Sequence, residues 1–246
     1  MANDRIYGIH AVTALLERTP ERVVRVIVQK GRQDKKMHAI EALCAKHQIA
    51  VEQWGKEQLQ KRFAEATHQG VVAEVSQHSS PNYSENDLEG LVEDASQPLL
   101  LVLDGIQDPH NLGACLRSAD AAGVTAVIVP KDNAASITAT VRKVACGAAE
   151  TVPFITVTNL ARTLRWLKDQ GVWIYGLAGE TETSLYQTDL NGPIALALGA
   201  EGKGLRRLTR ELCDGLVKIP MDGTVESLNV SVATGISLFE AKRQRG

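Results

Sequence analysis

The sequence predicts an α/β protein with a small N-terminal domain and a larger C-terminal domain built on a mainly parallel sheet. Short apolar runs alternate with segments of helical periodicity along most of the 246 residues, as in sheets that helices cover on both faces. A polar stretch at residues 76–97 contains five acids and no Lys or Arg. We interpret it as an acidic linker between the two domains, although an ordered surface loop of one larger domain fits the same composition.

The first domain, residues 1–75, has the pattern of a small α/β sandwich. Apolar residues at helical spacing predict helices at 9–18 and 35–47. Strands rich in β-branched residues are expected at 23–29, 49–54 and 70–75. Within the linker, the apolar residues predict a short helix around 87–92.

The second domain, residues 98–246, has a stronger alternation. Strands are expected at 99–103, 126–129, 152–157, 172–177, 194–198 and 216–219. Helices are expected at 112–123, 139–148, 160–170, 205–212 and 230–242. Because ligands bind at the carboxyl ends of strands in such sheets, we expect functional residues in the loops that follow them.

Charge is distributed unevenly along the chain. The total of 27 Lys and Arg against 29 acids argues against a uniformly basic surface for nucleic acid. Residues 1–75 nevertheless carry 12 basic and nine acidic side chains. The basic residues cluster in a segment that includes a strand-to-helix loop: Arg22, Arg25, Lys30, Arg32, Lys35 and Lys36. These six could contact RNA phosphates, or they could form an ordinary solvated loop.

The cysteines and the N-terminus indicate a cytoplasmic protein. Cys44, Cys115, Cys146 and Cys213 form no CxxC pair, so we expect small buried hydrophobes in a reducing compartment rather than metal ligands or disulfides. The N-terminus lacks the pattern of a signal peptide. No apolar run approaches the roughly 20 residues that span a bilayer. We therefore expect no metal and no membrane partner.

Three loops of the second domain are unusually polar or rich in glycine. The first, DGIQDPHNLGACLRSADAAG, contains Asn111 and Arg117, and Asn111 or His110 could cap the next helix. The second, GAEGKGLRRL, surrounds Glu201 with three glycines but is neither a dinucleotide fingerprint nor a P-loop. The third, PMDGTVESLNVSVATGISLFEA, holds Ser227 and Asn229. Taken singly, each loop fits helix capping as well as it fits function.

Taken together and in this order, the three loops are more informative. NLGACLRSADAAG, GAEGKGLRRL and IPMDGTVESLNVSVATGI resemble the three motifs of the SPOUT superfamily of RNA methyltransferases. More narrowly, they resemble its TrmH-like branch, whose members methylate ribose 2′-hydroxyls. The opening YGIHAV…LLE and the stretch THQGVVAEV extend the resemblance over nearly the whole chain.

The resemblance implies a fold, a reaction and partners. The fold would combine an N-terminal RNA-binding domain of the L30e/L7Ae type with a methyltransferase domain whose C-terminal part forms a trefoil knot. S-adenosylmethionine would donate a methyl group to the 2′-hydroxyl of a guanosine in 23S rRNA, as free RNA or in a ribosomal precursor. The protein would be a homodimer associated through the knotted domain.

The resemblance also implies roles for individual residues. Arg117 would orient the hydroxyl and stabilise the developing alkoxide, since a guanidinium is a poor base. Asn111 would hold the ribose or Arg117, and Glu201 would fix Arg117 or the cofactor loop. The other implied contacts are Ser227 and Asn229 in the acceptor pocket, Gly199, Ile219 and Leu228 around the cofactor, and Tyr7 and His10 as additional RNA contacts.

Three alternatives remain open on the sequence. One keeps the chemistry and changes the acceptor to a tRNA ribose. A second is an RNA-binding assembly protein without catalysis, although Asn111, Arg117 and Glu201 are all present. A third, an enzyme that binds a small-molecule nucleotide, would need a dinucleotide fingerprint that the sequence lacks.

Overall fold

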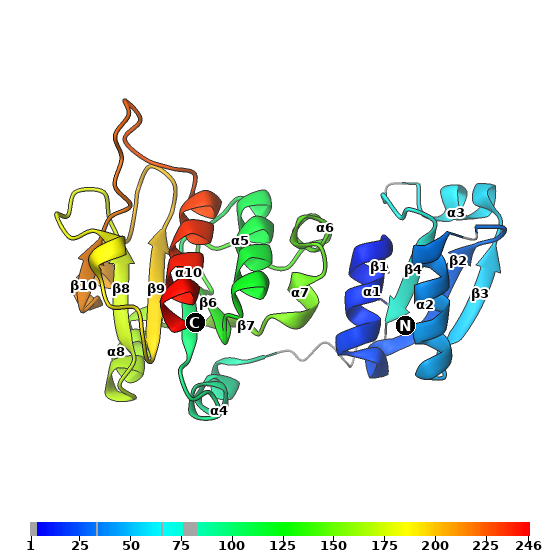
Figure 1. Ribbon diagram of the computed structural model, residues 1–246, viewed down its shortest axis with the longest axis horizontal. Coiled ribbons are helices and arrows are strands. Elements are labelled where there is room, and N and C mark those ends of the chain that lie inside the picture. Colours follow the sequence, from blue (N-terminus) through cyan, green and yellow to red (C-terminus); the bar gives the residue numbers. More distant parts are fainter. Residues whose placement is uncertain (1–3, 33, 65, 76–82) are drawn as a thin grey trace. The chain divides into compact units, whose positions relative to one another are not determined.

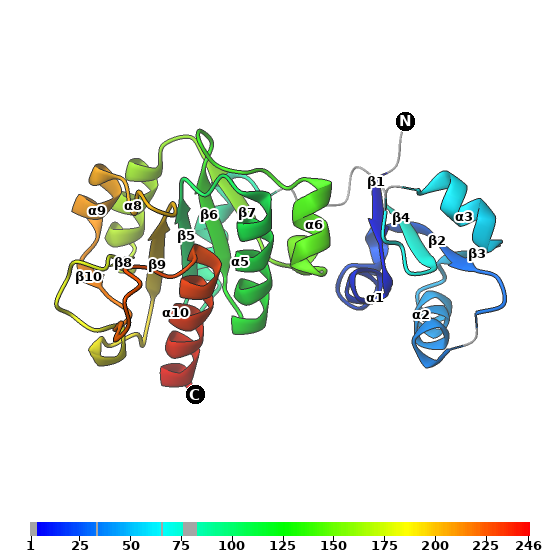
Figure 2. The ribbon, with the colours of Figure 1, turned by 90° about the horizontal axis from the view of Figure 1, so that it is seen from above.

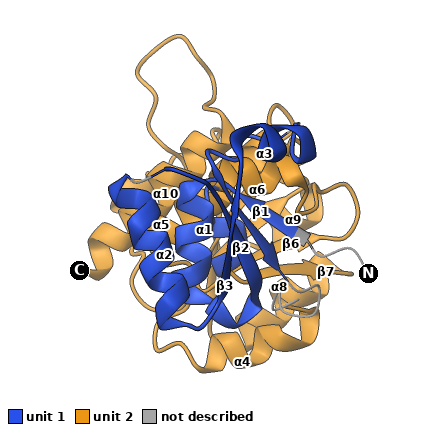
Figure 3. Ribbon diagram, turned by 90° about the vertical axis from the view of Figure 1, so that its right-hand side faces the viewer, with its two compact units in different colours: residues 1–82, 146–151 blue, residues 83–145, 152–246 orange. Residues whose placement is uncertain are grey.

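A computed structural model describes residues 4–32, 34–64, 66–75 and 83–246. The chain divides into two compact units (Figure 3). The first unit consists of the described part of residues 1–82 together with 146–151, and the second of residues 83–145 and 152–246. Each unit has its own sheet and its own buried core.

The first unit is a mixed sheet of four strands in the order β1-β4-β2-β3. These strands are β1 (Asp4–Tyr7), β2 (Val23–Gln29), β3 (Ala50–Trp54) and β4 (Val71–Val75). Strand β4 runs antiparallel to β1 and β2, and β3 runs parallel to β2. Three of these elements depart from the prediction. Strand β1 was not expected, and the strands expected at 49–54 and 70–75 each begin one residue later, at Ala50 and Val71.

Helices cover both faces of this sheet. A short 3-10 helix, η1 (Pro20–Arg22), precedes β2. Helices α1 (Ile9–Arg18) and α2 (Lys35–Lys46) pack their apolar sides on one face around Leu16 and Ile40. Helix α3 (Lys56–Arg62), which was not predicted, places Leu59 on the other face beside Phe63 and Ile27. Asp34 caps α2 because its side chain accepts hydrogen bonds from two backbone amides of the first turn.

The second unit is a parallel sheet of six strands in the order β10-β8-β9-β5-β6-β7 (Figure 1). The strands are β5 (Leu99–Asp104), β6 (Ala126–Pro130), β7 (Phe154–Val157), β8 (Trp173–Leu177), β9 (Ile194–Gly199) and β10 (Gly215–Val217). Every neighbouring pair is parallel. The predicted mainly parallel sheet is thereby confirmed, with the two most apolar strands, β5 and β9, side by side in the middle.

Helices also cover both faces of the parallel sheet. Helices α5 (Pro109–Ala122) and α10 (Val230–Arg245) lie side by side on one face (Figure 2). Helices α4 (Leu88–Glu93), α8 (Leu160–Asp169) and α9 (Arg207–Leu212) cover the other. Two short helices, α6 (Ala139–Ala145) and α7 (Ala148–Thr151), lie between β6 and β7 in the chain. They replace the single helix that we expected at 139–148.

Part of the expected linker belongs to the second unit. Residues 83–97 form a 3-10 helix, η2 (Glu85–Asp87), and α4, whose Leu88 and Val92 are buried in the second unit's core. The Glu85 carboxylate accepts a hydrogen bond of 2.7 Å from Arg162 Nη2, and this contact lowers the pKa of Glu85. The acidic stretch is therefore anchored from residue 83 onward, while residues 76–82 lie outside the described residues.

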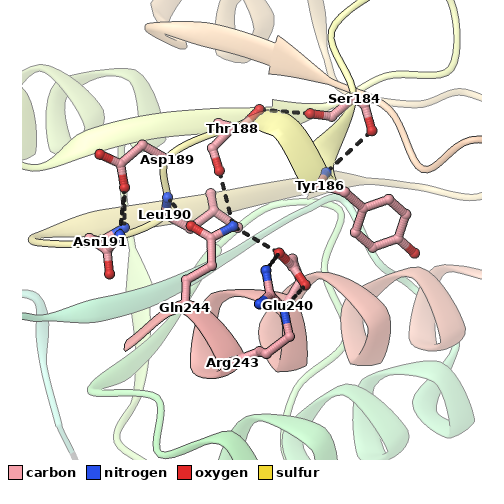
Figure 4. A network of polar contacts seen from close by, with 9 residues as sticks. All are labelled: Ser184, Tyr186, Thr188, Asp189, Leu190, Asn191, Glu240, Arg243 and Gln244. Atoms are coloured by element: carbon pink, nitrogen blue, oxygen red, sulfur yellow. Dashed lines mark hydrogen bonds and ion pairs between the residues drawn. The ribbon is translucent and has the colours of Figure 1, made fainter. Parts of the chain in front are cut away.

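The last turn of α10 holds the connection between β8 and β9 (Figure 4). This connection contains η3 (Leu185–Gln187). Gln244 donates a hydrogen bond to the carbonyl of Thr188 (3.1 Å) and accepts one from the amide of Leu190 (2.9 Å). Its amide also donates to Glu240, which accepts two hydrogen bonds from Arg243. These contacts lower the pKa of Glu240 to about 2, the contribution of Arg243 being the larger.

The cysteines correct one expectation. Cys44 and Cys115 are buried and Cys213 is partly buried, and desolvation raises the pKa of each to about 11. Cys146 is exposed, so the expectation that it is a buried hydrophobe was wrong. The physical reason is local, because Cys146 (φ 53°) and Gly147 (φ 101°) adopt left-handed conformations that break the expected helix at this point.

The described residues contain neither a membrane-spanning helix nor a cluster of metal-ligating side chains. Within them, no helix is both long enough and apolar enough to cross a bilayer. The same residues contain no group of three or more His, Cys, Asp or Glu side chains arranged to hold a metal ion.

Candidate functional site

A cavity of about 660 Å³ lies where β8, β9 and β10 end. Its walls come from the ends of these strands, from the glycine-rich loop after β9, from the connection between β10 and α10, and from the first turn of α10. Five of the predicted site residues line it: Gly199, Glu201, Ile219, Ser227 and Leu228. The structure thus brings together the predicted cofactor residues and two of the five predicted catalytic residues.

The glycine-rich loop folds back tightly on itself. The amide of Gly204 donates a hydrogen bond of 2.8 Å to the carbonyl of Ala200. A Cβ atom on Gly199 would lie 1.9 Å from the carbonyl carbon of Gly204. Gly202 and Gly204 adopt positive φ angles of 75° and 63°. Glycine is therefore required for close backbone approach at 199 and favoured by the backbone conformation at 202 and 204, and the backbone forms much of this wall.

The opposite wall is fixed by pairing between two connections. The amide of Lys218 donates to the carbonyl of Thr183 (2.9 Å), and the amide of Leu185 donates to the carbonyl of Lys218 (2.8 Å). This pairing extends β10 by one residue and holds Ile219 at the wall. The connection continues from there to α10 as the orange-red loop of Figure 1.

Two of the cations that line the cavity, Arg210 and Lys218, are paired with carboxylates. Arg210 forms an ion pair with Glu180, and Lys218 Nζ lies 3.5 Å from Glu182. Apolar side chains, including Ile219 and Leu228, and backbone groups of the glycine-rich loop share the remaining wall. Such a cavity suits a ligand with a flat apolar ring and polar groups that the backbone can bind.

Two predicted catalytic residues contact each other outside the lining of the cavity. Asn229 Nδ2 donates a hydrogen bond of 3.0 Å to Asn111 Oδ1, although the two residues are 118 positions apart. Asn229 Oδ1 also caps α10 by accepting from the amide of Ser231 (2.9 Å). At the other helix, the cap is Asp108, whose carboxylate accepts from the amide of His110 (2.9 Å). The suggested capping role of Asn111 or His110 was therefore wrong, because α5 begins at Pro109.

Arg117 stands apart from these contacts. It lies on α5, is exposed, and is absent from the lining of the cavity. Among the described residues, its guanidinium has no hydrogen-bond or ion-pair partner. Its cationic edge is therefore available to a ligand that approaches from solvent.

Sequence reasoning missed a buried ion pair that joins two of the loops. Asp104, the last residue of β5, is 1% exposed. Its carboxylate accepts hydrogen bonds from the backbone amide of Arg206 (3.0 Å) and from Arg206 Nε (2.5 Å). The available signal was an acid at the end of the otherwise apolar run LLLVLD. Its partner, 102 residues further on, could not be read from local pattern.

The six basic residues of the first unit fall into two groups. Arg22 is 1% exposed and its Nη1 atom lies 3.0 Å from the carboxylate of Glu150 in the same unit. Arg25 contacts Glu52 (2.5 Å) and Glu74 (2.8 Å), and Arg32 is paired with Asp34. Lys30, Lys35 and Lys36 are exposed. The three lysines are accessible to a ligand, whereas Arg22 is buried and cannot contact RNA phosphates.

Tyr7 and His10, which were expected as additional RNA contacts, differ in exposure. Tyr7 is half-buried and its ring meets that of Phe63 edge-on, with 5.8 Å between centroids. His10 is exposed on α1. Tyr7 therefore has a packing role in the first unit.

Comparison with known proteins matches both parts of the chain. Residues 98–239 match the SpoU rRNA Methylase family, and residues 5–81 match a domain described as RNA 2′-O ribose methyltransferase substrate binding. The chain is similar to the 23S rRNA (guanosine-2′-O-)-methyltransferase RlmB of Escherichia coli (strain K12), with 58% identity over 99% of both chains. It is 56% identical to the RlmB of Pectobacterium atrosepticum over 98% of both chains.

A solved structure agrees with the fold. It is the SpoU methyltransferase AviRb from Streptomyces viridochromogenes in complex with the cofactor AdoMet, and it matches with a TM-score of 0.75 and 24% identity. The match covers 99% of this chain and 90% of AviRb. On the matched family profile and the full-length relatives, the chain belongs to the SpoU rRNA methylase family.

Proposed function

We propose that this protein transfers a methyl group from S-adenosylmethionine to the ribose 2′-hydroxyl of a guanosine in 23S rRNA. The observation that carries the proposal is the 58% identity with an enzyme of this name over nearly the full length of both chains. The cavity, the Asn111–Asn229 pair and Arg117, whose guanidinium has no partner in the described part of the chain, are consistent with such a reaction.

The residues around the cavity fit S-adenosylmethionine. Gly199, Gly202 and Gly204 have no side chains and line the cavity, so their backbone groups are available to polar atoms of the ligand, and Ile219 and Leu228 offer apolar surface to an adenine ring. The bound cofactor supplies a methyl group activated on a sulfonium. Glu201, which is exposed at the tip of the loop, would stabilise the loop or orient Arg117.

The acceptor side would be formed by polar residues at the start of α5 and α10. Arg117 would orient the 2′-hydroxyl and stabilise the negative charge that develops on its oxygen as the new C–O bond forms and the C–S bond breaks. Asn111 and Asn229, already joined by a hydrogen bond, would hold the ribose together with Ser227. The hydroxyl proton would leave through a phosphate of the RNA, because guanidinium remains protonated.

The first unit would bind the RNA. We assign this role to residues 1–75, with an L30e/L7Ae-like fold, and the catalytic role to residues 98–246. Its exposed lysines, Lys30, Lys35 and Lys36, would contact phosphates, with Arg32 and His10 in support. Aromatic residues are 4% of the chain, so phosphate contacts and RNA shape would contribute more than base stacking.

The second unit would be knotted and dimeric. The trefoil knot would be formed by the glycine-rich loop and the connection between β10 and α10, which meet at the cavity. A homodimer would bury Val232 and Phe239, which are 49% and 48% exposed on α10. A substrate in 23S rRNA or its ribosomal precursor would place the protein in the cytoplasm.

The decisive experiment compares 2′-O-methyl groups in RNA from cells with and without this protein. We expect one guanosine of 23S rRNA to lose its methyl group and to regain it when the protein is restored. A lost site in tRNA instead would favour the tRNA alternative. If no site is lost, and calorimetry shows no binding of S-adenosylmethionine, the chain is an RNA-binding protein without this activity.

A further inference from the structure

We propose that Arg206, oriented by Asp104, binds a phosphate of the acceptor RNA at the edge of the cavity. This inference rests on the proposed function and adds a contact in the second unit to that site. Four cations occur within eight residues in and directly after the glycine-rich loop: Lys203, Arg206, Arg207 and Arg210.

Three of the four cations have carboxylate partners among the described residues, and these partners differ in exposure. Arg207 pairs with Glu211 (2.6 Å) on the surface of α9, and Arg210 pairs with Glu180. Both of those acids are exposed, so their charge would repel an approaching phosphate. The partner of Arg206 is Asp104, whose side chain is completely buried. The negative charge therefore lies behind the guanidinium, on the side away from solvent.

The contact with Asp104 also fixes the direction of the guanidinium. Nε and Nη2 of Arg206 both face the carboxylate, and the backbone amide of Arg206 donates to its second oxygen. The Arg206 side chain is nevertheless 48% exposed, and among the described residues Nη1 has no partner. An arginine held in this way offers its outer edge to an anion with little conformational entropy left to lose.

The position of the pair connects it to the methyl-transfer site. Asp104 is in register with Gly199 on the neighbouring strand β9. The loop from Gly199 to Leu205 lines the cavity, and Arg206 follows it directly. The same carboxyl end of β5 leads through a short loop to the first turn of α5, which carries Asn111. A phosphate bound by Arg206 would therefore lie beside the place where the ribose must approach the methyl donor.

The main test uses the double variant D104N/R206Q. Removal of Arg206 alone would leave a buried carboxylate without a cation and could prevent folding, whereas the double variant keeps a neutral hydrogen-bonding pair. We expect about tenfold weaker binding to a 23S rRNA fragment, and a plot of log affinity against log salt whose slope falls by about one. The Kd for S-adenosylmethionine, measured by calorimetry, should stay within about twofold of the wild-type value, because Arg206 does not line the cavity.

R207Q is the matched control, since it removes a neighbouring exposed arginine that pairs only with Glu211 among the described residues. We expect its RNA affinity to change less than that of the double variant. R206K adds a second measurement, because lysine keeps the charge but cannot contact Asp104 through two nitrogens. Compared with the double variant, R206K should keep most of the wild-type salt slope but only part of the wild-type RNA affinity.

Two outcomes would overturn the inference. One is a folded double variant with wild-type RNA affinity and salt slope. The other is unchanged RNA affinity with weaker S-adenosylmethionine binding, which would limit the pair to anchoring the glycine-rich loop. Failure of the proposed function is separable from both, because the wild-type protein would then itself fail to methylate the 23S rRNA fragment.

Discussion

The cavity at the ends of β8, β9 and β10 and the surface around Arg117 differ in how their charged groups are held. In the cavity, Arg210 and Lys218 are paired and the glycine-rich loop closes on itself, so these parts of the wall exist before any ligand arrives. Arg117 is exposed and has no partner among the described residues. We therefore expect that binding of the methyl donor and activation of the acceptor can be separated by mutation.

The largest expected effect comes from Arg117→Ala. We expect methyl transfer in single-turnover assays to fall by about 10²–10⁴-fold, the range for a residue that assists proton removal or stabilises charge in the transition state. The Kd for S-adenosylmethionine should not change, because Arg117 does not line the cavity. Arg165→Ala is the control, since Arg165 is an exposed arginine on α8. Near-normal turnover in Arg117→Ala would remove Arg117 from the mechanism.

The complementary change is Gly199→Ala. The added Cβ would lie 1.9 Å from the backbone of Gly204, so the loop must shift. The strain of such overpacking is about 1–3 kcal/mol. Because the clash already exists in the ligand-free protein, the displaced loop no longer forms the same wall, and we expect S-adenosylmethionine to bind roughly ten- to hundredfold more weakly. Calorimetry measures this directly. Gly223→Ala is the control because nothing lies within 4 Å of its Cβ position, and equal affinity in the two variants would contradict a preformed loop.

A smaller effect is expected from the first unit. The triple variant K30Q/K35Q/K36Q removes three exposed cations, and the slope of log affinity for 23S rRNA against log salt should fall by about two. K56Q/K61Q, on α3 at the other face of the sheet, provides a control of similar charge loss. If the control weakens binding as much as the triple variant, the RNA surface lies elsewhere in the first unit.

The smallest expected effect separates two roles of Asn229. Asn229→Ala loses the cap of α10, which lowers the free energy of unfolding by about 1 kcal/mol. Asn229→Asp keeps an acceptor for the amide of Ser231 but loses the donor to Asn111. We expect urea unfolding of the Asp variant to resemble that of the wild type while its methyl transfer is reduced. Normal transfer in the Asp variant would make Asn229 a capping residue alone.

Local pattern predicted most of the fold because each buried strand is a continuous apolar run. All six strands of the second unit were expected within a few residues of their observed bounds. The two elements that were missed lack this signal. Strand β1 has four residues and pairs with β4 about 70 positions away, and α3 buries only Leu59 of its seven residues.

In the candidate site, too, local sequence pattern predicted some residues but no contacts between distant segments. Gly199 and its loop were predicted as site residues from the sequence, because close backbone approach needs glycine and the three glycines can be read directly from it. The contacts Asp104–Arg206 and Asn111–Asn229 span more than 100 residues each. They depend on strand order and loop path, so only the three-dimensional structure reveals them. The same holds for the buried position of Arg22.

The position of α10 has a consequence for synthesis of the protein. Val230 and Ala233 in its first turns line the cavity, and Gln244 near its end holds the connection between β8 and β9. This helix follows every other described element in the chain. Domains fold as they leave the ribosome, N-terminal parts first. The cavity is therefore completed only after α10 has been synthesised, and a nascent chain without α10 lacks the part of the wall that Val230 and Ala233 form.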